Sequence, residues 1–177
     1  MSNIVNKGTN AGGSNTNKTG LSYEEFTDIS EYINVLNKTK TYSLIKFKNN
    51  SNKEYVSVKK SQLLKYKIPE VSPGHGCKQP DECYINENEK IIFIIEKKFQ
   101  QSAGSVCEKL QTAPFKKQIY QTMYPTYDIV YIYCLSDWFK TNCAIEISIL
   151  EQYNIPIFWG NDKKYKSKII DFITNYR

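Results

Sequence analysis

The stretch Pro80–Lys98 reads PDECYINENEKIIFIIEKK, and the rest of the chain is organised around it. Its apolar run Ile91–Ile95 is too short to span a membrane, and its β-branched content predicts a strand that is buried on both faces. The polar segment Asn86–Glu89 is typical of a turn. We therefore expect Glu82–Ile85 and Lys90–Lys98 to form a β-hairpin.

This hairpin is expected to gather two carboxylates and an ammonium at one end. Side chains alternate along a strand, so Glu96 and Lys98 share one face while Lys97 points to the other. Asp81, where the partner strand begins, would lie across from them. Mg²⁺ binds one or two protein carboxylates, keeps several waters and takes phosphate oxygens as further ligands. A metal-activated water beside an ammonium predicts hydrolysis of a phosphodiester.

At these residues the chain resembles a known family. Pro80-Asp81 followed by Glu96-x-Lys98 is similar to the motif of the PD-(D/E)xK nuclease superfamily. The flanking segments GHGCKQPD and EKKFQQSAGSVCEKLQT are similar to small type II restriction endonucleases, and the resemblance covers roughly residues 74–159. It implies that Asp81 and Glu96 bind Mg²⁺ and that Lys98 assists the attacking water.

Polar and basic residues around the motif are candidates for DNA contacts. In the superfamily that the chain resembles, the helix after the catalytic strand borders the active site and often the DNA. The residues in this position are Gln100, Gln101, Ser102 and Ser105, near the expected phosphate, and Lys109, Lys116 and Lys117, facing the DNA backbone. The basic region 41–68, with Lys59 and Lys60, is either a second DNA-contacting module or a solvated lysine face.

Other interpretations of the site stay open at the level of sequence. A strand that ends in Glu-Lys-Lys is also typical of a strand that simply reaches solvent. Glu82 could replace Asp81 as a ligand, although the family pattern favours Asp81. A helix expected to begin near Ser22 offers Glu24 or Glu25 as a further acidic ligand, although the capping-box pattern of Ser22 and Glu25 favours helix capping instead. His75, Cys77 and Cys83 would supply only three nearby zinc ligands without a C-x-x-C motif, which disfavours zinc.

Composition predicts one soluble domain. The chain of 177 residues suits a single nuclease domain over 21–177, and residues 1–20 hold too few hydrophobes to fold, which predicts a disordered arm. A net charge of +6 favours polyanionic partners such as double-stranded DNA. Arg177 is the single arginine, so lysine, asparagine and glutamine would have to read bases.

Cysteine usage predicts the compartment. Five cysteines are an odd number without a paired framework, and we find no secretory signal. These features predict free thiols in a reducing cytoplasm. No apolar stretch is long enough to span a bilayer, so no membrane partner is expected.

The remaining pattern predicts an α/β protein with a mixed β-sheet flanked by helices, a restriction-endonuclease-like core, and a small basic β-hairpin before the catalytic hairpin. Residues 57–67 fit no single element. The other expected elements are helices over 22–37, 105–123 with a restart at Pro114, 141–153 and 165–176, and strands over 41–47, 54–58, 127–135 and 155–159.

The leading hypothesis is a Mg²⁺-dependent type II restriction endonuclease that cuts double-stranded DNA at a short specific sequence. A palindromic target would require a homodimer, because two-fold sites match two-fold proteins. The alternatives are a repair nickase or Holliday-junction resolvase of the same superfamily, a non-catalytic DNA-binding protein that retains a degenerate site, and a basic interaction domain without a nucleic-acid role.

Overall fold

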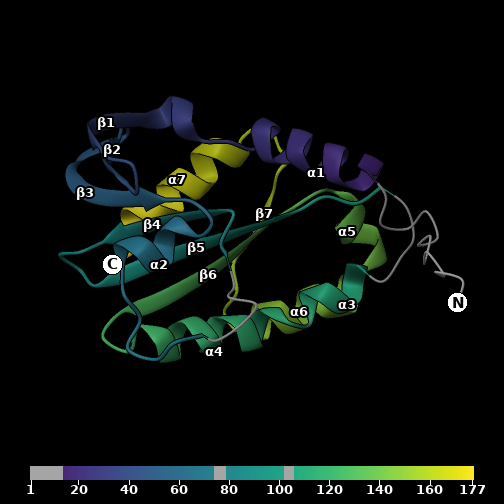
Figure 1. The fold of residues 1–177 in the computed structure, drawn as a ribbon. Coiled ribbons are helices and arrows are strands. Elements are labelled where there is room, and N and C mark those ends of the chain that lie inside the picture. Colours follow the sequence, from purple (N-terminus) through teal and green to yellow (C-terminus); the bar gives the residue numbers. More distant parts are fainter. Residues whose placement is uncertain (1–13, 74–78, 102–105) are drawn as a thin grey trace, which may run out of the picture.

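The computed structural model describes residues 14–73, 79–101 and 106–177 (Figure 1). Within these residues, seven strands form one sheet whose spatial order follows the chain. The strands are β1 (Ile33–Lys38), β2 (Ser43–Phe47), β3 (Asn50–Val58), β4 (Glu82–Asn86), β5 (Ile91–Lys98), β6 (Asp128–Leu135) and β7 (Ile157–Trp159).

The sheet is mixed, and β5 is the strand at which its character changes. Strands β1 to β5 pair as antiparallel neighbours, whereas β5, β6 and β7 run parallel. Parallel neighbours need crossover connections, and helices provide them here. The first crossover holds α3 (Val106–Leu110) and α4 (Ala113–Met123), and the second holds α5 (Trp138–Asn142) and α6 (Ala144–Gln152).

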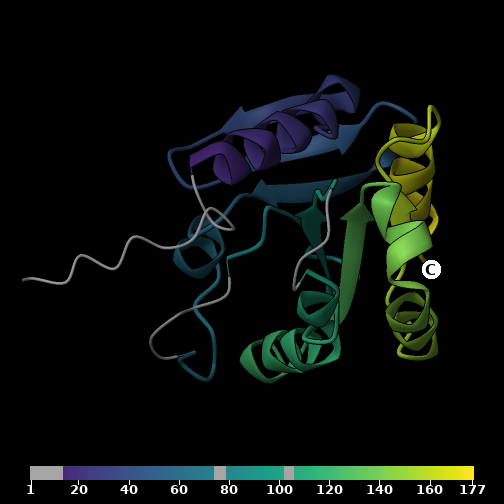
Figure 2. The ribbon, with the colours of Figure 1, turned by 90° about the vertical axis from the view of Figure 1, so that its right-hand side faces the viewer.

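Helices cover both faces of the sheet. In Figure 1, α1 (Ser14–Phe26) and α7 (Tyr165–Asn175) lie above the sheet, and α3, α4 and α6 lie below it. Figure 2 shows the same layers from the side, with α5, α6 and α7 gathered at the β7 edge. This arrangement confirms the expected α/β class with a mixed sheet between helices. The restriction-endonuclease-like core stays a prediction.

The expected hairpin is present. Strands β4 and β5 are antiparallel neighbours, with Glu82 opposite Ile95 and Asn86 opposite Ile91. Every residue of the run Ile91–Ile95 is buried, as predicted for a strand covered on both faces. Ile92 and Ile94 belong to the apolar cluster under α4 and α6, while Ile91, Phe93 and Ile95 belong to the cluster under α1 and α7.

The N-terminal elements differ from expectation. The helix predicted over 22–37 was wrong in both bounds, because α1 already begins at Ser14 and ends at Phe26. Residues 14–20 are therefore helical rather than part of a disordered arm, and residues 1–13 lie outside the described residues. Residues Ile33–Lys38 form strand β1 rather than continuing the helix. Pairing with β2 at the antiparallel edge of the sheet satisfies their backbone hydrogen bonds.

Two other segments refine the expectation. The unassigned region 57–67 contains the end of β3 and the short helix α2 (Gln62–Tyr66). The single helix expected over 141–153 is divided into α5 and α6, because the backbone of Cys143 leaves helical geometry at φ −135°.

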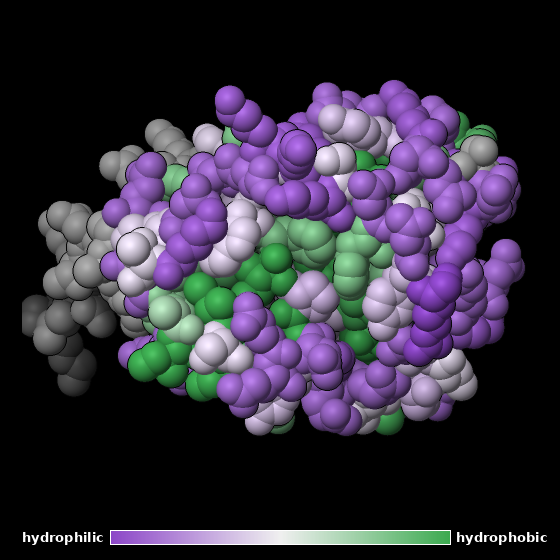
Figure 3. Space-filling model, turned by 180° about the vertical axis from the view of Figure 1, so that it is seen from behind, coloured by the Kyte–Doolittle hydropathy of each residue, from purple (hydrophilic) through white to green (hydrophobic). Residues whose placement is uncertain are grey.

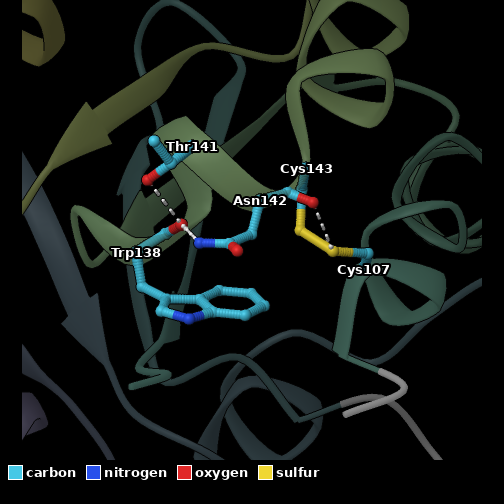
Figure 4. Close-up of a disulfide and its surroundings, with 5 residues drawn as sticks. All are labelled: Cys107, Trp138, Thr141, Asn142 and Cys143. Atoms are coloured by element: carbon cyan, nitrogen blue, oxygen red, sulfur yellow. Dashed lines mark hydrogen bonds between the residues drawn. A yellow bond between two sulfur atoms is a disulfide. The ribbon is translucent and has the colours of Figure 1, made fainter. Parts of the chain in front are cut away.

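A disulfide joins α3 to the junction of α5 and α6. The sulfurs of Cys107 and Cys143 are bonded, and the Cα atoms lie 5.7 Å apart (Figure 4). The expectation of free thiols was therefore wrong for this pair, although Cys83 and Cys134 are free and buried. The separation of 36 residues explains why no local motif indicated the bond.

Candidate active site

Asp81 lies at the beginning of β4, directly beside the end of β5. The backbone amide of Lys97 donates a hydrogen bond to Oδ2 of Asp81 at 2.7 Å. This contact holds the carboxylate next to the residues that follow Ile95. Burial and the negative charge of Glu96 raise the pKa of Asp81, and the Lys97 amide and the Lys98 ammonium offset these effects only in part.

Glu96 and Lys98 project from the same face of β5 and contact each other. The Lys98 ammonium lies 2.7 Å from Oε1 of Glu96. Lys116, from the first half of α4, reaches the same oxygen at 3.1 Å. Burial opposes ionisation of Glu96, but the two lysines outweigh it and lower the pKa of this carboxyl. The structure thus pairs Glu96 with both Lys98 and Lys116, and it places Asp81 near enough for the charges of Glu96 and Lys98 to act on its pKa.

The alternating residues Glu82 and Lys97 point to the opposite face and form a separate pair. The Lys97 ammonium lies 2.6 Å from Oε1 of Glu82, and both side chains are almost excluded from water. The Tyr84 hydroxyl donates to the other Glu82 oxygen at 3.0 Å. Because both oxygens of Glu82 are engaged inside the protein, Asp81 is the better candidate ligand.

Helix α1 brings further acidic groups near Asp81. A pocket of about 240 Å³ is lined by Asp81 from the sheet and by Glu24 and Glu25 from α1. The negative charge of Glu24 contributes, behind burial and Glu96, to the raised pKa of Asp81. Of the two acidic residues proposed as an extra ligand, Glu24 therefore acts on Asp81 electrostatically, and Glu25 shares its pocket.

A buried tyrosine lies under the site. Tyr131 of β6 pairs with Ile94 of β5, and its hydroxyl is buried and makes no hydrogen bond of normal geometry. Burial, followed by the charge of Glu96 and more weakly that of Asp81, raises the pKa of Tyr131. The Tyr131 hydroxyl interacts with Tyr133, since this contact partly offsets the rise that burial causes in the pKa of Tyr133.

The predicted DNA-contact residues are divided among several surfaces. Lys59 and Lys60 line the pocket of Asp81 and Glu24, and Lys59 pairs with Asp28 at 3.0 Å. Gln100 and Gln101 line a separate pocket with Trp138 and Asn161. Lys117 lines a groove at the β7 side of the molecule, and the Lys109 carbonyl accepts a hydrogen bond from Tyr133. Ser102 and Ser105 lie outside the described residues.

The carboxylates of the site fit a hard cation by their chemistry. Asp81 and Glu96 supply oxygen ligands, and the second oxygen of each takes no part in the contacts described above. Elsewhere in the described residues, Cys107, Cys143 and Glu146 form a close group of three potential ligands, but the two sulfurs are bonded to each other. Cys83 is buried within β4, which disfavours it as a zinc ligand. The other two residues of the zinc interpretation, His75 and Cys77, lie outside the described residues.

Sequence analysis named Lys116 as a DNA-backbone contact but did not predict its ion pair with Glu96. Its neighbours Ala113, Tyr120 and Met123 form the buried stripe of α4, so position 116 belongs to a face where an apolar residue is expected. A lysine inside an apolar helical stripe is a signal from which sequence analysis could have inferred an acidic partner.

Comparison with protein-family models, with curated proteins and with solved structures finds no match to this chain. Within the described ranges, every helix is too short or too polar to cross a bilayer.

Proposed function

We propose that the chain is a Mg²⁺-dependent type II restriction endonuclease that hydrolyses double-stranded DNA at a short specific sequence. The observation that carries the proposal is the convergence of Asp81, Glu96 and Lys98 at the end of a buried hairpin. A bare strand end in solvent would not account for a carboxylate that is held by a backbone amide beside a second, lysine-paired carboxylate.

Each residue has a role in the proposed reaction. Asp81 and Glu96 hold the cation through carboxylate oxygens. The cation, when bound, lowers the pKa of a water and stabilises charge on the phosphate. Lys98 orients the attacking water and stabilises the negative charge that builds on the phosphate oxygens. The attacking water gives a proton to solvent as its oxygen bonds to phosphorus, the bond between phosphorus and the leaving sugar oxygen breaks, and that oxygen takes a proton from solvent.

A homodimer is part of the proposal, because a palindromic target presents two equivalent strands. An apolar surface supports it. Ile145 and Ile149 are exposed one turn apart on α6, and Tyr153, which follows the helix, is also exposed. Two other residues of α6, Ile147 and Glu151, line a groove of about 700 Å³ together with apolar residues of the β7 and α7 region, and its charged residues carry both signs, among them Lys117 and Glu151. Figure 3 shows this hollow from behind, with apolar side chains inside a polar border.

The test of the nuclease is digestion of long DNA of mixed sequence with Mg²⁺, compared between wild type and the variants Asp81→Asn, Glu96→Gln and Lys98→Met. We expect discrete fragments from wild type and at least a 100-fold slower reaction from each variant. A smear of fragments, or cleavage of branched DNA alone, would favour a nickase or resolvase. If all three variants cleave DNA at the wild-type rate, the proposal is overturned.

The dimer is tested separately by light scattering after gel filtration. Ile145→Glu should convert a dimer into a monomer, because a carboxylate replaces an apolar contact. Ile68→Glu is the matched control, because Ile68 is also an exposed isoleucine but lies outside this surface. A wild-type protein that is monomeric with and without DNA would exclude the proposed assembly.

A further inference from the structure

The two lysines that contact Glu96 come from different elements of the fold. Lys98 follows Glu96 by two residues on the same strand, so their contact requires no other element. Lys116 comes from α4, and its side chain is 19% exposed in a position between the buried residues Ala113 and Tyr120. Burying an ammonium is costly unless it is paired. The fold therefore places a second ammonium at Glu96 where packing alone favours an apolar side chain.

Glu96 has one negative charge but contacts two ammonium groups, so neutralising Glu96 does not by itself account for Lys116. One ammonium is sufficient to neutralise one carboxylate, and Lys98 is the nearer of the two at 2.7 Å. Lys116 contacts the same oxygen, Oε1, at 3.1 Å. A divalent cation that binds Glu96 would compete with both ammoniums for this carboxylate. An ammonium displaced from Glu96 needs a new anion, and the scissile phosphate is the anion that enters the proposed site.

We propose that Lys116 is a further catalytic residue, which leaves Glu96 when the cation binds and contacts a non-bridging oxygen of the scissile phosphate. This inference rests on the proposed nuclease function. Its contact neutralises phosphate charge in the transition state, a role distinct from that of Lys98 toward the attacking water. It also makes Lys116 a competitor of the cation in the DNA-free protein.

Lys166 provides a matched control. It has the same side chain and lies on α7, where it pairs at 2.7 Å with Glu31, a residue outside the candidate site. Removing its charge changes the net charge of the protein by the same amount as removing that of Lys116. A general loss of attraction to DNA would therefore affect both variants alike, whereas a role in the site affects only Lys116.

The experiment measures two quantities for Lys116→Met, Lys116→Gln and Lys166→Met in the full chain. The first is Mn²⁺ or Mg²⁺ affinity without DNA, by calorimetry. The second is kcat and KM for cleavage of the long DNA substrate. We expect the Lys116 variants to bind the cation several-fold more tightly and to cleave with kcat lowered by roughly 100-fold at nearly unchanged KM. Lys166→Met should keep the wild-type kcat.

The outcomes separate this inference from the proposed function. A Lys116→Gln variant that is folded by circular dichroism and cleaves at the wild-type rate would overturn the role of Lys116 alone. Loss of cation affinity together with activity would assign Lys116 to holding Glu96 in place, and would also overturn the inference. A wild-type protein that binds neither cation and cleaves no DNA would instead refute the nuclease function itself.

Discussion

The carboxylate of Glu82 and the ammonium of Lys97 lie 2.6 Å apart on the face of the sheet opposite Glu96 and Lys98, and both residues line the pocket that contains Asp81. Each residue is the immediate chain neighbour of a site residue, and strand alternation sends the two pairs to opposite faces. The two strands thus carry the buried ion pair on one face and the pair of Glu96 and Lys98 on the other, while Asp81 lies beside the end of β5 and lines the same pocket as the buried pair. The ion pair fixes the same strand ends from which the site residues project.

Removing one partner of this pair should destabilise the protein strongly. Glu82→Gln leaves the Lys97 ammonium buried without its counter-charge, and we expect a loss of about 3–5 kcal/mol in the free energy of unfolding. The double variant Glu82→Leu, Lys97→Met removes both charges and should recover most of this loss. Urea unfolding measures the effect. As a control, Asp137→Asn breaks an exposed pair with Lys140 and should cost about 1 kcal/mol or less. If Glu82→Gln and Asp137→Asn lower the free energy of unfolding by the same amount, the prediction is wrong.

The disulfide between Cys107 and Cys143 should contribute to stability through the loop that it closes. For a separation of 36 residues, constraint of the unfolded chain corresponds to about 3–4 kcal/mol. Thermal unfolding with and without reductant measures it, and the double variant Cys107→Ser, Cys143→Ser should no longer respond to reductant. Thiol titration in denaturant should find three thiols before reduction and five after. Five thiols before reduction would show that the bond is absent.

Asp28 should make stability depend on pH in the acid range. Burial opposes its ionisation, but hydrogen bonds from Ser30 and the contact with Lys59 outweigh burial and lower its pKa from 3.8 to about 2. A pKa that is lower in the folded state adds stability above the unfolded pKa, and this stability is lost as the pH falls toward 2. The carboxylate is partly exposed, so the contribution is about 1 kcal/mol or less.

Melting temperatures of wild type and Asp28→Asn from pH 7 to pH 2 test this linkage. The difference between the two proteins should be constant above about pH 4 and should shrink as the pH approaches 2. A difference that grows on acidification would have the wrong sign and would reject the assignment to Asp28.

Binding to duplex DNA, measured without a cation that supports cleavage, should weaken steeply with salt. For six to ten phosphate contacts, the affinity should fall by roughly 10³-fold or more between 50 and 200 mM salt. Replacing a lysine that contacts a phosphate reduces the slope of log affinity against log salt by about 1. Lys60→Gln should show this reduction if the pocket of Asp81 lies along the DNA. An affinity that does not change with salt would argue against a DNA partner.

The hairpin and the site motif were predictable because their determinants are local. The run Ile91–Ile95, the turn at Asn86–Glu89 and the two-residue spacing of Glu96 and Lys98 lie within one continuous segment. Strand alternation alone then separates Glu96 from Lys97. The same holds for β6, whose apolar run was expected as a strand and is the parallel neighbour of β5.

The errors have non-local causes. Phe26, Ile29, Ile33 and Leu36 are spaced like one face of a helix, but the chain leaves α1 at Phe26, and Asp28 then accepts a hydrogen bond from the Ser30 amide in a tight turn. Pairing with β2 decides the conformation after that turn. In the same way, an odd number of cysteines says nothing about which pair meets in space, and only the packing of α3 against α6 brings Cys107 to Cys143.

Strand β5 has a hydrogen-bonded neighbour on each edge and a helical layer over each face. Its central amides should therefore exchange with deuterium only when the whole protein unfolds. Glu96 and Lys98 extend directly from this slowest-opening segment, so their spacing is insensitive to smaller breathing motions of the periphery. In the proposed nuclease, adjustment to a duplex would accordingly come from the surrounding helices and loops, and Glu96 and Lys98 would keep their positions on β5.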